Sequence, residues 1–190
     1  MKKYSLIYLI LTTLIFSCNQ ENSEIRTQTS ESTIAEIDSL NDAGVKYVTQ
    51  LDTTAIEIFD KAIVLSDKIG YEKGKINALI RKGVYYFNKS DMEQAKKHYQ
   101  QGLMLAESIA DSSDIAKFTG NLALVETYNG NYTKALELQF KTIDYYKNNE
   151  PEKLAGKLVD IGIIYFHLNE KDKALENFTK GLEHAEQYKD

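Results

Sequence analysis

The side chains best suited to chemistry are few and scattered in this 190-residue sequence. The three histidines (His98, His167 and His184) have no partner at a metal-ligand spacing, and Cys18 is the single cysteine. The sequence also lacks a glycine-rich phosphate loop and a pair of histidines four residues apart. We therefore expect no enzyme activity, no metal and no cofactor, and we expect each histidine to be a surface or groove residue.

Cys18 follows a segment typical of a secretory signal peptide, which we place at residues 1–17. Two lysines precede an apolar run over residues 6–16, whose helical length of about 16 Å is roughly half a bilayer core. The segment Leu14-Ile15-Phe16-Ser17-Cys18 resembles the lipobox of bacterial lipoproteins. That resemblance implies a lipid on Cys18, which would become the new N-terminus. The alternative is an ordinary cleaved leader with an incidental cysteine.

Residues 18–33 are predicted to form a disordered tether because they are polar and show no periodicity. A flexible chain of this length would hold the folded part roughly 20 Å from a membrane. We expect an exported, membrane-anchored lipoprotein at the periplasmic face, the outer membrane or the cell surface.

Charge and composition narrow the range of partners. The formal net charge is −5, which argues against a nucleic acid because phosphate binding needs a basic face. Hydrophobic residues make up 43% of the chain, enough for a folded core, while one proline and ten glycines argue against a turn-rich β protein. We expect a protein or peptide partner.

An internal repeat organises the rest of the chain. Alanines recur at Ala55, Ala95, Ala135 and Ala174, with spacings of 40, 40 and 39 residues. A constant period of this length is typical of a helical solenoid. In each repeat a first helix carries a small residue (Gly83, Ala123, Gly162), and the second helix of two repeats carries an aromatic residue (Tyr99, Phe178). The small residues let two antiparallel helices approach closely, and the aromatic residues fill the space between them.

This pattern resembles the tetratricopeptide repeat, in a long variety of about 40 residues. The resemblance covers residues 34–190 and implies an all-α, right-handed α-solenoid of about four antiparallel helix pairs, approximately at 34–70, 72–110, 114–148 and 151–190. Two details are also predicted from the residues. Ser90 with Glu93 forms a capping-box pattern at the start of a helix, and Glu126 and Gln139, at positions that are aromatic elsewhere, should make the third pair the loosest.

The resemblance further implies that the first helix of each pair lines a concave, peptide-binding face. Its register assigns a largely apolar stripe to that face, which we call the inner stripe: Ile80, Val84, Phe87, Leu124, Tyr128, Val159, Ile163 and Phe166. An amphipathic helix would suit such a stripe. The alternative is that tightly coiled repeats bury the stripe against one another.

Two functions remain open at this stage. One is a non-catalytic scaffold for protein–protein interaction, tethered by the lipid. The other is the N-terminal sensory region of a membrane signal transducer, a histidine kinase or DNA-binding regulator, with its output domain beyond residue 190. No polar capping helix follows Leu182, so we expect a longer protein, self-association through the last helix, or an exposed apolar face.

Overall fold

The computed structural model describes residues 30–188, and in that range the chain forms eight helices and no strand. The predicted leader, Cys18 and most of the predicted tether lie outside the described residues. The described chain begins in a helix at 30–49, so residues 30–33, which the sequence placed in the tether, are helical. Seven further helices follow: α2 (Thr54–Ile69), α3 (Glu72–Asn88), α4 (Met92–Ser108), α5 (Ser112–Tyr128), α6 (Tyr132–Asn149), α7 (Pro151–His167) and α8 (Lys171–Gln187).

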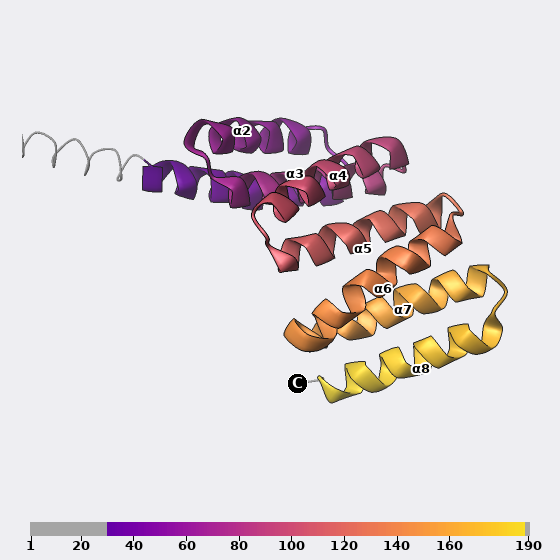
Figure 1. Ribbon diagram of the computed structural model, residues 1–190. Coiled ribbons are helices and arrows are strands. Elements are labelled where there is room, and N and C mark those ends of the chain that lie inside the picture. The colour runs from indigo at the N-terminus through magenta and orange to yellow at the C-terminus, as the bar shows by residue number, and fades with distance from the viewer. Residues whose placement is uncertain (1–29, 189–190) are drawn as a thin grey trace, which may run out of the picture.

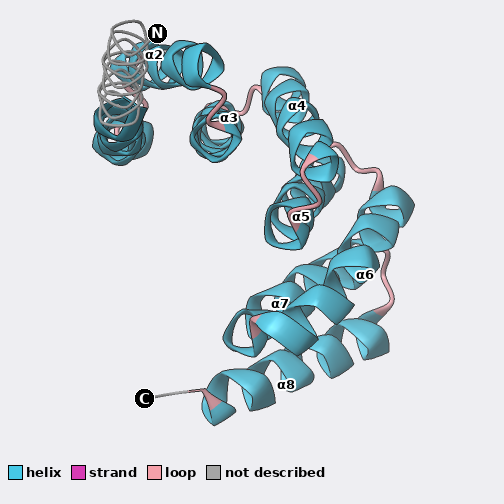
Figure 2. Cartoon of the chain, turned by 60° about the vertical axis from the view of Figure 1, so that its left-hand side comes forward, coloured by secondary structure: helices cyan, strands magenta, loops and turns pink. Residues whose placement is uncertain are grey.

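The helices pack as four pairs that stack in chain order, from helix 30–49 with α2 to α7 with α8 (Figure 1). The predicted solenoid of helix pairs is thereby confirmed. In Figure 2 the stack follows a curve, with α3, α5 and α7 along its inner side and α2, α4 and α6 along its outer side. None of the described helices is long and apolar enough to cross a membrane.

The turn inside each pair is made by one residue in the left-handed backbone region: Leu51, Ser90, Gly130 and Asn169. Ser90 has φ +60° and therefore does not begin α4, so the predicted capping box is wrong. Asp91 takes that role, and its side chain accepts a hydrogen bond from the Gln94 backbone N–H at 3.1 Å.

A glycine facing an aromatic ring closes three of the four pairs. Gly44 lies against Phe59, Gly83 against Tyr99 and Gly162 against Phe178, so closely that a Cβ on any of these glycines would overlap the ring. The same arrangement joins neighbouring pairs where Gly102 of α4 meets Phe118 of α5. The helices can approach to this distance only because these glycines lack side chains.

The third pair uses polar residues instead and is not loose. Gln139 is fully buried and Glu126 is only 7% exposed. Glu126 accepts hydrogen bonds from Lys96 at 2.6 Å and from Asn131 at 2.7 Å, while Gln139 donates to Asp160 at 3.3 Å. The expectation of a loose third pair is wrong, because α5 and α6 pack as extensively on each other as α3 and α4 do. The bonds to Lys96 and Asp160 also tie this pair to α4 and α7.

Candidate binding face

The predicted inner stripe packs partly against the core on α3 and becomes more exposed toward the C-terminal pairs. Its members on α3 (Ile80, Val84, Phe87) and Leu124 on α5 are half-buried. Those nearer the C-terminus are more exposed, with Tyr128 and Phe166 both at 61%, Ile163 at 40% and Val159 at 39%. The first helices of neighbouring pairs touch only lightly, so they do not bury the stripe against one another.

Aromatic contacts connect the stripe from one pair to the next. Phe87 of α3 meets Tyr128 of α5 edge-on, with ring centroids 6.2 Å apart. Further along, the ring of His167 on α7 stacks on Tyr132 of α6 at 5.1 Å and meets Phe166 edge-on at 6.2 Å. These contacts join Phe87 to Tyr128, and Phe166 through His167 to Tyr132, a residue that was not predicted. The sequence register could not find Tyr132, since it belongs to a second helix.

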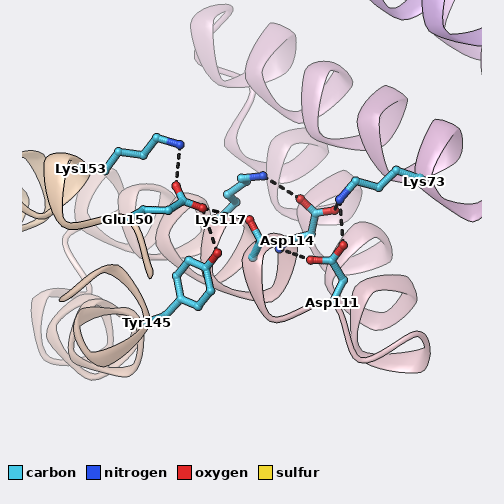
Figure 3. Close-up of polar contacts among 8 residues, drawn as sticks. Lys73, Asp111, Asp114, Lys117, Tyr145, Glu150 and Lys153 are labelled. Carbon is cyan, nitrogen blue, oxygen red and sulfur yellow. Dashed lines mark hydrogen bonds and ion pairs between the residues drawn. The ribbon is translucent and has the colours of Figure 1, made fainter. Parts of the chain in front are cut away.

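A polar cluster lies at the other end of the same helices, where α3, α5 and α7 begin (Figure 3). Lys73 of α3 bonds both Asp111, the residue that caps α5, and Asp114 in the first turn of α5. Asp114 is only 2% exposed and also pairs with Lys117 at 3.0 Å. These ion pairs fix the angle between the second and third repeats, because a buried carboxylate needs its cationic partners in place.

The next junction repeats this arrangement with different residues. Glu150 caps α7 and accepts hydrogen bonds from Ser113 of α5 at 3.1 Å and from the Tyr145 hydroxyl at 2.9 Å, and it also pairs with Lys153 (Figure 3). Hydrogen bonding to Lys73 and to the Asp114 N–H holds the pKa of Asp111 below its usual value. Hydrogen bonding to Lys153 does the same for the pKa of Glu150. Both carboxylates are therefore ionised partners at neutral pH.

The histidines divide between surface and core. His167 is exposed, as predicted, but His98 is only 8% exposed and stacks on Tyr86 with ring centroids 5.4 Å apart. The prediction that His98 is a surface or groove residue is wrong because its ring fills space between α3 and α4. Among the described residues, no group of three or more histidine, cysteine or acidic side chains could hold a metal ion.

Four stacked helix pairs, three of them closed by a glycine–aromatic contact, define a helical-repeat fold similar to that of tetratricopeptide repeats. Residues 76–109, which include most of α3 and all of α4, match the tetratricopeptide repeat family model. No curated protein sequence matches this chain.

Several solved structures share the fold, among them the following three. One is BtubC (BKLC) from P. vanneervenii, with 14% identity and a TM-score of 0.65 over 78% of this chain and 64% of that chain. Aspartyl phosphate phosphatase F from Bacillus subtilis has 18% identity and a TM-score of 0.75 over 83% of this chain and 42% of that chain. The apo form of RapI has 14% identity and a TM-score of 0.74 over 83% of this chain and 45% of that chain. This chain spans less than two thirds of each of them, and at these identities the likeness shows the fold. The repeat and the fold support a scaffold for protein–protein interaction.

Proposed function

We propose that this chain is a non-catalytic scaffold that holds an amphipathic helix of a partner protein on the inner stripe. One observation carries the proposal: Tyr128, Ile163 and Phe166 are large apolar residues that share a surface and stay 61%, 40% and 61% exposed. Exposed apolar residues gathered in this way mark interaction sites, and a helical partner would bury them with its own apolar face.

Site-specific photo-crosslinking in the native host tests this proposal. A photoreactive phenylalanine analogue at Phe166 should give a discrete protein adduct, and the same analogue at Val64 is the matched control. Val64 is 66% exposed but lies on α2, on the outer side of the curve. An adduct of equal yield from both positions, or none from Phe166, would refute the inner stripe as the binding surface.

We further propose that a lipid on Cys18 tethers the scaffold to a membrane. The support is the sequence of residues 14–18, which resembles a lipobox. Metabolic labelling with an alkyne fatty acid should mark the wild-type protein and fail to mark Cys18→Ser. Label on both proteins would mean that the lipid is attached to another residue. Label on neither would mean that the protein carries no lipid.

The outer face of α8 supports a second contact, with another copy of this chain. Leu175 and Leu182 are 66% and 60% exposed and lie two turns apart on one face of the helix. Lys171 precedes this pair by four residues, and Glu186 follows it by four. In an antiparallel pair of α8 helices, Leu175 would therefore meet Leu182 of the partner, and Lys171 would meet the opposite charge of Glu186. The sensory-region alternative would instead cover this face with later residues of the same chain.

A further inference from the structure

A pocket of about 540 Å³ lies away from the inner stripe, between α2, α3 and α4. Its apolar wall comes from Ile63, Leu79, Met104 and Leu105, and its polar groups are Lys75, Lys82, His98, Gln101 and Ser108. Small-molecule sites commonly have about this volume and this mixture of an apolar wall with a few polar groups.

Two of the polar residues occupy positions that are aliphatic in several of the other repeats. Lys82 corresponds to Leu122 in the third pair and to Ile161 in the fourth. His98 corresponds to Ile58 in the first pair, to Leu138 in the third and to Asn177 in the fourth. Folding alone would be served by leucine at both positions, because burying a polar side chain is costly. The departure of both residues from the repeat, in one pocket, points to a ligand.

The burial of these two residues is nearly complete. The side chain of Lys82 is 9% exposed, and its ammonium, which has three donors, pairs with Asp60 of α2. The Asp60 side chain is 54% exposed, so it can move into solvent when another anion takes its place. His98 has a buried Nδ1 without a hydrogen-bond partner in the described structure. Burial, with the Lys82 charge as the next cause, lowers the pKa of His98 to about 4, so its ring is neutral at pH 7.

The charged residues around the pocket favour one sign of charge on the ligand. Lys75 and Lys82 are its ionisable wall residues apart from the neutral His98. Lys75 pairs with Asp67, which is 55% exposed and, like Asp60, belongs to α2 outside the lining. An anionic end group would therefore meet an ammonium group, whereas a cationic one would meet like charge.

We propose that this pocket binds an aliphatic carboxylate, with the carboxylate on the ammonium group of Lys82 and the hydrocarbon chain against Ile63, Leu79 and Met104. The site is separate from the inner stripe. On α3, Lys75, Leu79 and Lys82 follow one face, while Ile80, Val84 and Phe87 follow another.

Methionine methyl NMR tests the proposal on the full chain, with sodium decanoate as the probe below its micellar concentration. Met104 lines the pocket and is 71% exposed, whereas Met92 is 9% exposed in the core and is an internal control. Decanoate should shift the Met104 methyl signal saturably and leave that of Met92 in place. Decanol, which has the same chain without the charge, should bind at least tenfold more weakly.

The variant Lys82→Leu/His98→Leu gives this pocket the residues of the third repeat. It should keep the Met92 signal, which reports an intact core, and lose the Met104 shift. Lys180→Met removes an exposed lysine of α8 and should leave the titration unchanged. The proposal is overturned if decanoate gives no saturable Met104 shift, or if the double variant binds it as tightly as the wild type.

Discussion

Gly83 of α3 lies directly against the ring of Tyr99 on α4, and a Cβ at this position would overlap Cε1 and Cδ1 of the ring. Tyr99 is only 2% exposed, so its ring has no free space into which to move. The distance between the two helices of the second pair is therefore set by the absence of one methyl group.

We predict that Gly83→Ala lowers the free energy of unfolding by about 1–3 kcal/mol, because overpacking outweighs the higher helix propensity of alanine. Gly156→Ala on α7 is the matched control. No atom lies within 4 Å of a Cβ built there, so it should stabilise the protein by about 0.5–1 kcal/mol. Chemical denaturation followed by circular dichroism measures both changes. Equal effects from the two variants would disprove the close contact.

The third pair should accept the glycine–aromatic contact only when both partners change together. Ala123 and Gln139 occupy the positions of Gly83 and Tyr99, and Gln139 is fully buried. We predict that Gln139→Tyr alone destabilises the protein, and that Ala123→Gly added to it restores at least about 1 kcal/mol. A double-mutant cycle measures this coupling. Additive effects would show that the two positions are not in contact.

His98 should make stability depend on pH in a window of its own. Its pKa is lowered from 6.5 to about 4 in the folded protein, so the unfolded chain takes up the proton first as the pH falls. Stability should therefore decrease between pH 6.5 and about 4, by at most about 3 kcal/mol.

His98→Leu should flatten the curve of melting temperature against pH in that window. The carboxylates Asp111 and Glu150 have lowered pKa values, so their contribution to stability is lost at the acid end of that window and below it, as the pH falls below their usual pKa values of 3.8 and 4.5. The further decline at acid pH should thus remain in His98→Leu. An unchanged slope between pH 6.5 and 4 would mean that His98 is not buried in its neutral form.

The face of α8 should control self-association if the proposed dimer forms. Leu182→Lys places a charge in the centre of the Leu175–Leu182 contact and should shift the protein toward monomer in sedimentation velocity. Val64→Lys changes a residue of similar exposure on α2 and should have no effect. A wild-type protein that stays monomeric at high concentration would argue against this contact.

The sequence predicted the parts of this molecule that repeat. The spacing of Ala55, Ala95, Ala135 and Ala174 located all four helix pairs, because close packing of each pair demands a small residue at the same place. It also assigned eight residues to the inner face, and that assignment stays a prediction. Whether that face was open could not be predicted, because exposure depends on how far successive pairs rotate, and no single repeat encodes that rotation.

The polar contacts between repeats could not be predicted from the sequence for a related reason. Lys73 and Asp111 are 38 residues apart, and each alone has the character of a solvated helix residue. Lys82 and His98 departed from the repeat pattern, and comparison with Leu122 and Leu138 could have singled them out. Their burial, however, depends on α2, α3 and α4 meeting around them, which only the folded structure reveals.

The most direct test of the inner stripe is the affinity of the crosslinked partner for Phe166→Ala, measured beside the stability of the same variant. We predict that binding weakens by about 1–3 kcal/mol while the free energy of unfolding changes by less than about 1 kcal/mol. Phe118→Ala, at a fully buried ring, should instead cost about 3–5 kcal/mol of stability. If Phe166→Ala unfolds as readily as Phe118→Ala, or binds the partner with unchanged affinity, the inner stripe is not the binding surface.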